Sequence, residues 1–177
     1  MEGPSGVGKD TVVRELMKKY PHKYVKMPST ATRAMRPGES QGNPYFFVTR
    51  EEFQAKIASG DVFEYTVLPR DGEYRGMSHH IIDNILASDK IQIKDCDEIG
   101  LRALKKEYGD LVMGIFLVAE KEEIEKRLRA RGGTEEEIAK RLGDFEEYMK
   151  YAHQFDHIIT NDNLMDCVDK VDTIISR

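Results

Sequence analysis

The stretch Gly3-Pro4-Ser5-Gly6-Val7-Gly8-Lys9-Asp10-Thr11 decides the fold of this chain. Up to Lys9 it fits the phosphate-binding loop pattern, in which a glycine is followed by four residues, a second glycine and a lysine. Glycines allow backbone N–H groups to turn inward and wrap a phosphate, and the lysine adds a cation aimed at the β- and γ-phosphates. The residues after the loop have helical spacing, so a helix N-terminus also faces the ligand. The stretch therefore predicts a nucleotide-phosphate site at Ser5–Thr11.

Two features of this loop depart from the usual pattern. The position after the lysine normally carries Ser or Thr, whose hydroxyl binds Mg²⁺, but here it is Asp10. A carboxylate can also bind Mg²⁺, so Asp10 is a candidate metal ligand. The loop should follow a buried strand, yet only Met1 and Glu2 precede it. We expect this first strand to lie upstream of the present numbering, or its place to be taken by neighbouring strands or by another chain.

Composition narrows the class of protein. The chain has 177 residues, enough for one domain with a substantial core, and a net charge of -5, which argues against non-specific nucleic-acid binding. Cys96 and Cys167 form neither a metal-ligand spacing nor a disulfide framework, so a cytoplasmic location is expected. No apolar run reaches membrane length, and we expect no membrane partner. Composition does not decide between a monomer and a homo-oligomer.

Strands and helices are expected to alternate along most of the chain. This order is typical of an α/β fold with a parallel sheet flanked by helices. Capping boxes at Thr49 with Glu52 and at Thr134 with Glu137 mark helix starts, and Ser78 is a further candidate cap. Strands are expected at 24–27, 62–68, 90–93, 111–118 and 155–160, and helices after the loop to about 20 and at 49–59, 78–87, 98–107, 120–131, 134–153 and 163–176. Residues 28–87 break the alternation and are predicted to form an inserted small mixed-β lobe on a core of residues 1–27 and 88–177.

A basic loop at 29–43 is the second candidate site. Arg33 and Arg36 lie in a loop with Pro37 and Gly38, and Tyr45 follows. The planar fork of an arginine matches phosphate oxygens two at a time, so the loop is a candidate for a second phosphate. A solvated basic loop is the alternative for this segment taken alone.

Together these motifs resemble the guanylate kinase family of P-loop nucleoside-monophosphate kinases. The resemblance lies in GPSGVGK (3–9), TRAMRPGE (32–39) and YFFVTREEF (45–53), and it can be followed over nearly the whole chain. It implies a single domain with a helical lid at about 121–145 and transfer of the γ-phosphoryl group of ATP to GMP with Mg²⁺. Both nucleotides are then small-molecule partners, and the loop residues Ser5, Gly6, Val7, Gly8, Lys9, Asp10 and Thr11 bind ATP.

The resemblance also assigns roles outside the loop. The GMP phosphate is expected at Ser29, Arg33, Arg36 and Tyr45. The guanine edge is expected at Glu64 and Asp97, because a carboxylate accepts from N1–H and N2–H₂ together. Asp95 is expected to orient water around Mg²⁺, and Asn161 to lie near the adenine. The catalytic cations are expected to be Lys9 and the lid residues Arg127, Arg131 and Arg141.

Three further positions leave alternatives open. Gly-Lys-Asp also occurs in kinases resembling those that form ribose 1,5-bisphosphate, which suggests another acceptor. Pro28 is typical of guanylate-kinase-like protein-interaction domains that have lost catalysis. The family's Tyr-Gly-Ser/Thr near the guanine is replaced by Arg75-Gly76-Met77, so Tyr74 or Ser78 is expected to supply the missing hydroxyl, and Tyr74 is counted with the GMP-binding residues. The sequence favours a guanylate kinase over these alternatives.

Overall fold

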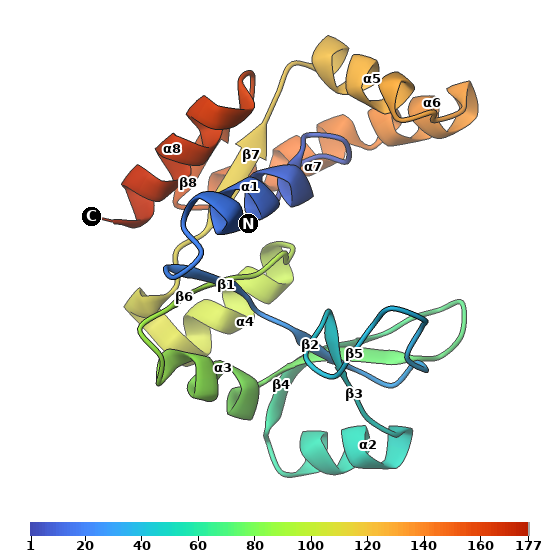
Figure 1. The fold of residues 1–177 in the computed structure, drawn as a ribbon. Helices are drawn as coiled ribbons and strands as arrows, with labels where there is room; N and C mark the ends of the chain where they lie inside the picture. Colours follow the sequence, from blue (N-terminus) through green and yellow to red (C-terminus); the bar gives the residue numbers. More distant parts are fainter. Residues whose placement is uncertain (177) are drawn as a thin grey trace. The chain divides into compact units, whose positions relative to one another are not determined.

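The computed structural model describes residues 1–176, and the chain divides into two compact units (Figure 1). The first unit is Met1–Pro21 together with the described part of Asp95–Arg177, and the second is His22–Lys94. The second unit is larger than the lobe predicted at 28–87. It includes strands β1 (Tyr24–Lys26) and β6 (Ile91–Ile93), which pair with each other in parallel and so hold both ends of the segment together.

The first unit carries the phosphate-binding loop on an α/β framework. Its strands β7 and β8 are paired in parallel, from Ile115 opposite His157 to Val118 opposite Thr160. Glu2 extends this pairing, because its N–H donates to Ile115 O at 2.9 Å and its carbonyl accepts from Leu117 N at 2.7 Å. The elements of this unit are α1 (Lys9–Lys19), α4 (Glu98–Tyr108), the 3₁₀ turn Gly109–Leu111, β7 (Ile115–Val118), α5 (Lys121–Ala130), α6 (Glu135–Gly143), α7 (Phe145–Tyr151), the 3₁₀ turn Ala152–Gln154, β8 (His157–Thr160) and α8 (Leu164–Ile175).

Apolar residues from β7 and the helices form the core of the first unit. Phe116 on β7 is fully buried, and its ring centroid lies 5.2 Å from that of Phe155. Leu101 on α4 and Ala152 complete this buried cluster. Burying such aromatic and aliphatic surface supplies the main stabilising free energy of the unit.

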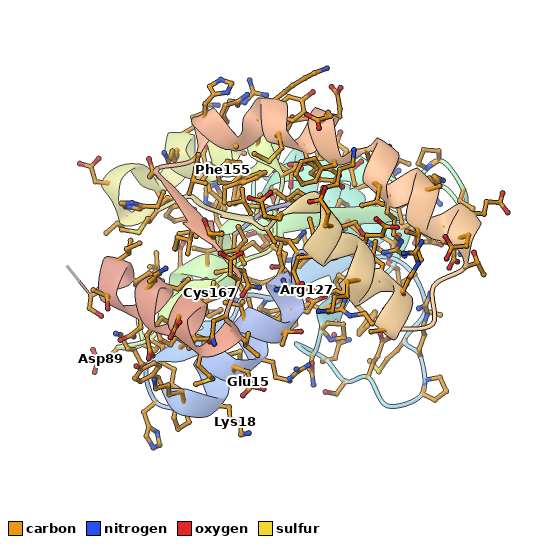
Figure 2. All side chains as sticks on the ribbon, turned by 90° about the horizontal axis from the view of Figure 1, so that it is seen from above. Glu15, Lys18, Asp89, Arg127, Phe155 and Cys167 are labelled. Atoms are coloured by element: carbon orange, nitrogen blue, oxygen red, sulfur yellow. The ribbon has the colours of Figure 1, made fainter. Side chains whose placement is uncertain are left out.

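Helices α1 and α8 pack together, and Cys167 on α8 is fully buried. Lys19 and Asp169 form an ion pair between the same two helices. Burial raises the pKa of the Cys167 thiol to about 11, although the positive charges of Lys170 and Arg127 act in the opposite direction. Cys167, labelled in Figure 2, thus behaves as a small apolar side chain of the core.

The second unit is built on a mixed four-stranded sheet of order β3-β2-β5-β4. Strands β2 and β3 are parallel, and the other two pairs are antiparallel. Its elements beside β1 and β6 are β2 (Ser29–Ala31), β3 (Tyr45–Phe47), α2 (Arg50–Ala58), β4 (Val62–Val67), β5 (Tyr74–Ser78) and α3 (His79–Leu86).

The two faces of this sheet differ in what covers them. Helix α2 packs on one face through Phe53, which is fully buried. A Cβ added to Gly76 on that face would lie 3.0 Å from the Phe53 ring and 2.6 Å from Glu64 O, so the close approach of α2 requires glycine there. Side chains alternate between faces along a strand. Arg75 and Met77, the residues before and after Gly76 in β5, therefore project from the opposite face.

The predicted α/β class is confirmed, and so are both capping boxes. The Thr49 and Thr134 hydroxyls accept from the backbone of Glu52 and Glu137, and those side chains accept in return. Ser78 occupies the N-cap position of α3 as predicted, but its hydroxyl donates to Asp61 at 2.8 Å and does not cap the helix. Asp61 itself accepts from the His80 N–H at the start of α3 at 2.9 Å, so a residue distant in sequence takes the capping role.

Three predicted boundaries are also wrong. Residues 29–31, predicted as part of a loop, form β2, a strand too short and polar to stand out in the sequence. The strand predicted from 111 begins only at Ile115, because the Gly114 N–H donates to the Asp156 carboxylate at 2.6 Å rather than to a strand. The helix predicted to run to 153 is interrupted between α6 and α7 at Gly143-Asp144, which have low helix propensity. Among the helices described in residues 1–176, none combines the length and apolarity needed to cross a bilayer.

Candidate active site

The phosphate-binding loop is held by glycines in a backbone conformation that other residues rarely adopt. Gly6 has φ 90° and Gly8 has φ 102°. A Cβ on Gly8 would lie 2.7 Å from the Asn161 amide nitrogen, so this position also needs glycine for space. The loop leads directly into α1, whose first residue is Lys9. The sequence thus builds the loop and helix N-terminus that bind phosphate groups.

The side chain of Lys9 folds back over the loop. Its Nζ donates to Gly3 O at 2.5 Å and lies 3.3 Å from Glu2 Oε1. The ammonium group is therefore fixed at the inner side of the loop, where incoming phosphate oxygens would compete for it.

Two of the three predicted lid arginines share a cavity with the loop. The cavity has a volume of about 170 Å³ and is lined by Pro4, Ser5, Gly6, Gly8, Lys9, Asp10, Thr11, Arg131 and Arg141. Arg141 donates to the Ser5 hydroxyl at 2.8 Å. Cations from the loop, the end of α5 and α6 therefore converge on one space. This is the arrangement that phosphoryl transfer needs, because its main requirement is stabilisation of charge on the transferring group.

Arg127, the third predicted lid arginine, has a different position. It donates to Val7 O at 3.2 Å and to Asn161 O at 2.8 Å, while its Nε donates to Glu123 at 2.9 Å (labelled in Figure 2). The Asn161 amide donates to the same Val7 carbonyl at 2.8 Å. Arg127 and Asn161 thus fix the backbone of the loop through the Val7 carbonyl. The resemblance placed both residues at the donor site, but it did not reveal this bracing role.

The second predicted site lies on the face of the sheet opposite α2. The register puts Ser29 opposite Tyr45, Ala31 opposite Arg75, and Glu64 opposite Met77. Residues directly opposite each other share a face, so Ser29, Tyr45 and Glu64 project from the same face of the sheet. Glu64 and Ser29 are partly buried, and Met77 is 3% exposed.

The arginines of the basic loop are arranged around Tyr45 and Glu39. The Arg33 guanidinium lies 5.1 Å from the ring centroids of both Tyr45 and Phe47. Its two terminal nitrogens donate to Glu39 at 2.7 and 2.5 Å, and Glu39 also accepts from the Arg36 N–H at 2.8 Å. These hydrogen bonds from Arg33 and Arg36 lower the pKa of Glu39 to about 2. The side chain of Arg36 is exposed.

Comparison with known proteins identifies the family. A model of the family described as guanylate kinase matches residues 1–177. The chain belongs to the guanylate kinase family. It is 34% identical over 175 residues to the guanylate kinase of Idiomarina loihiensis, covering 97% of this chain and 82% of that protein. It is also 34% identical to the guanylate kinase of Porphyromonas gingivalis, covering 100% of this chain and 95% of that protein.

Solved structures support the same fold. The guanylate kinase of Anaplasma phagocytophilum superposes with a TM-score of 0.66 at 24% identity, over 99% of this chain and 81% of that one. The SH3-kinase fragment of tight junction protein 3 superposes with a TM-score of 0.58 at 12% identity, over 99% of this chain and 55% of that one. At these identities the structures show the fold of the guanylate kinase family and nothing more.

Two residues that the resemblance assigned to GMP have other contacts in this family member. Tyr74 projects from the α2 face, where its ring centroid lies 5.1 Å from that of Phe53 and 5.3 Å from the Arg50 guanidinium. The structure does not bring it to Tyr45, because adjacent residues of β5 point to opposite faces and Arg75 takes the other one. Asp97 is exposed, and one of its carboxylate oxygens accepts from the Gly100 N–H at 2.9 Å, which caps α4.

The predicted metal ligands are both carboxylates. Asp10 is exposed in the first turn of α1 and lines the cavity, and Asp95 opens the segment that leads into α4. Within residues 1–176, no group of three or more His, Cys, Asp or Glu side chains could hold a metal. Mg²⁺ typically binds one or two carboxylates together with substrate phosphates and water. The oxygen donors present therefore fit Mg²⁺ bound with a nucleotide rather than a metal held by protein alone.

Proposed function

We propose that this chain transfers the γ-phosphoryl group of ATP to GMP, giving ADP and GDP. The observation that carries the proposal is the cavity in which Lys9, Arg131 and Arg141 meet the phosphate-binding loop. Membership of the guanylate kinase family supports GMP as the acceptor. The family alone gives the reaction class, whereas the retained cations support a catalytic rather than a vestigial site.

Each side chain has a role that follows from its chemistry. Lys9, Arg131 and Arg141 neutralise the charge that spreads over the transferring phosphoryl group. Asp10 and Asp95 would hold Mg²⁺, which neutralises charge on the ATP phosphates when it is bound. In the acceptor site, Ser29, Arg33, Arg36 and Tyr45 bind the phosphate of GMP, and the carboxylate of Glu64 accepts from the guanine N–H groups.

A coupled assay tests this function. The purified chain is given ATP, Mg²⁺ and either GMP, AMP, CMP or UMP, and formation of ADP is followed. We expect turnover with GMP that exceeds turnover with the other acceptors, and loss of that turnover in Lys9→Ala. Lys18→Ala is the matched control, because Lys18 is an exposed lysine on the same helix. A folded wild-type sample without GMP turnover would overturn the proposal.

A sugar bisphosphate is a second candidate acceptor. Met77 is buried at the position where the family carries a hydroxyl near the base, and Asp10 follows Lys9 as in kinases resembling those that form ribose 1,5-bisphosphate. The same assay with ribose bisphosphate as the acceptor distinguishes the two. Glu64 favours GMP, because a sugar phosphate offers no N–H groups to a carboxylate. Faster turnover of the sugar phosphate than of GMP would decide for this candidate.

A protein-interaction domain without catalysis is the third candidate. Pro28 favours it, and it is buried between β1 and β2. Calorimetry with ATP separates this candidate from the kinases. We expect ATP to bind, because Lys9 and the lid arginines remain, and such a domain does not need them.

We further propose a cytoplasmic enzyme. Neither Cys96 nor Cys167 forms a disulfide, which suits a reducing compartment. Fractionation of the source cells tests the location, and light scattering of the purified chain determines whether it is a monomer or a homo-oligomer.

A further inference from the structure

Arg75 is an arginine at the acceptor site that the family resemblance does not assign. Its guanidinium carbon lies 5.3 Å from the ring centroid of Tyr45, and the residue is partly buried. Its Nε is buried without a hydrogen-bond partner, and within residues 1–176 no ion pair involves Arg75. A buried guanidinium donor without a partner costs free energy, which a bound anion or water molecule would recover.

Arg33 also has a buried Nε without a hydrogen-bond partner, and it differs from Arg75 in its terminal nitrogens. Both guanidinium groups lie against the same ring, since Arg33 is 5.1 Å from the Tyr45 centroid. The fork of Arg33 is occupied by the Glu39 carboxylate, with hydrogen bonds of 2.7 and 2.5 Å. Arg75 has no such carboxylate. Of these two arginines, Arg75 therefore has its donors available to an anion without first breaking an ion pair.

The register places Arg75 beside the other residues expected to bind the acceptor phosphate. Arg75 lies opposite Ala31 on β2, and Ser29, two residues before Ala31, projects from the same face. Lys94, which follows β6, donates to the Ser29 hydroxyl. The position of Arg75 is one where the family carries a tyrosine, so a hydroxyl is exchanged for a cation with several N–H donors.

We propose that Arg75 binds the phosphate of the acceptor nucleotide. Lys94, which donates a hydrogen bond to Ser29, supplies a second positive charge to the same phosphate. This inference rests on the proposed function. A guanidinium fork can bind two oxygens of a phosphate dianion together. Since Met77 offers no hydrogen bond to the base, acceptor recognition in this chain relies more on the phosphate than the family pattern implies.

Steady-state kinetics with Arg75→Ala tests the proposal. We expect the KM for GMP to rise about 10- to 100-fold, because hydrogen bonds between charged partners are lost. The KM for ATP should stay within about twofold and kcat within about threefold, since uniform binding is removed. Arg75→Lys keeps the charge but not the fork, and should recover part of the affinity. Lys94→Met should raise the KM for GMP by a smaller factor, with Lys90→Met as its exposed control.

Arg50→Ala is the matched control for Arg75→Ala. Arg50 lies 5.3 Å from the Tyr74 ring, the same contact at the same distance, but on the face covered by α2. This variant should leave the KM for GMP within about twofold. An equal increase in both variants would mean that the sheet is merely destabilised, and would overturn the proposal. Arg75→Gln, which keeps the size of the side chain, replaces Arg75→Ala if circular dichroism shows that the alanine variant is unfolded.

Binding of ribose 5-phosphate, measured by calorimetry, separates this inference from the proposed function. The ligand carries the phosphate without the base. If wild type fails to phosphorylate GMP but Arg75→Ala binds ribose 5-phosphate at least about tenfold more weakly, the proposed function fails and the role of Arg75 stands. If Arg75→Ala changes neither ribose 5-phosphate binding nor the KM for GMP, the role of Arg75 is refuted whether or not GMP is the substrate.

Discussion

The phosphate-binding loop (the donor loop) and the sheet of β2, β3, β4 and β5 (the acceptor sheet) both present groups that suit phosphate, but they position these groups differently. The donor site takes most of its residues from one continuous segment, Ser5–Thr11, and its glycines set the backbone directly. The proposed acceptor site takes single residues from β2, β3, β4 and β5, and which of them share a face depends on strand register. A substitution in the loop thus changes a local conformation, whereas a substitution in the sheet changes one ligand of a preformed surface.

The two regions also hold their arginines differently. Arg141 donates to a neutral hydroxyl of the loop, and Arg127 bonds to backbone carbonyls as well as to Glu123. In the acceptor sheet, Arg33 is tied to Glu39 in a bidentate ion pair, while Arg75 stacks on Tyr45. The arginines near the loop, expected to act in catalysis, can therefore be mutated separately from those in the acceptor sheet, expected to act in binding.

The largest effect is expected at the catalytic cations. Arg131→Ala and Arg141→Ala should each lower kcat by about 10²- to 10³-fold, because each removes a positive charge from the cavity where the phosphoryl group is transferred. The thermal midpoint should change little, since both side chains are exposed. Arg129→Ala is the control, because Arg129 pairs with Glu125 and Glu135 on the same helices. Equal losses of kcat in Arg129→Ala and Arg131→Ala would contradict a specific catalytic role for the arginine that lines the cavity.

Arg127 should behave as a structural residue. Arg127→Met removes hydrogen bonds to Val7 O and Asn161 O, and should lower the free energy of unfolding by about 1–3 kcal/mol. Urea unfolding measures this, and Arg14→Met, at an exposed position, serves as the control. If Arg127→Met instead reduced kcat as strongly as Arg131→Ala with no loss of stability, Arg127 would belong with the catalytic cations.

Asp61 should make the stability of the acceptor unit depend on pH. Burial alone would raise its pKa, but hydrogen bonds from His80 N–H, Lys56 and Ser78 outweigh it and hold the pKa at about 2. The folded pKa is thus below the unfolded value of about 3.9, so its contribution is present above pH 4 and is lost as the pH falls toward 2.

Asp61→Asn should therefore cost about 1–2 kcal/mol at pH 6 and progressively less below pH 4. Unfolding monitored between pH 2 and pH 7 checks this. Asp89→Asn in the same unit should show no such dependence, because Asp89 is exposed. A destabilisation of Asp61→Asn that is the same at pH 2.5 and pH 6 would contradict the assignment.

The smallest effect concerns base selectivity. Met77→Ser restores a hydroxyl opposite Glu64 and should raise the preference for GMP over AMP by about three- to tenfold, the value of one neutral hydrogen bond. The ratio of kcat/KM for the two acceptors measures it. Met35→Ser is an exposed control in the same unit. An unchanged ratio in a folded Met77→Ser variant would show that this position does not read the base.

Sequence could predict the donor loop because its chemistry depends on spacing along the chain. The glycines, Lys9, and the capping boxes at Thr49 and Thr134 are all local patterns, and the structure confirms the helix starts that they mark. The roles of Arg127 and Asp61 could not be predicted, because their partners are distant in sequence and depend on packing. The face from which Tyr74 projects depends on the register of β5, which the sequence alone does not show.

The reactivity of the Cys167 thiol can be used to measure how often the first unit opens. Its thiol on α8 is fully buried and has a pKa of about 11, so alkylating reagents at pH 8 should meet almost no thiolate while α8 stays packed. The rate of alkylation then measures how often the packing around α8 opens. Added ATP should slow that rate in proportion to its occupancy, so ligand binding could be followed through a thiol that never contacts the nucleotide. Mass spectrometry of peptides would distinguish it from the more accessible Cys96.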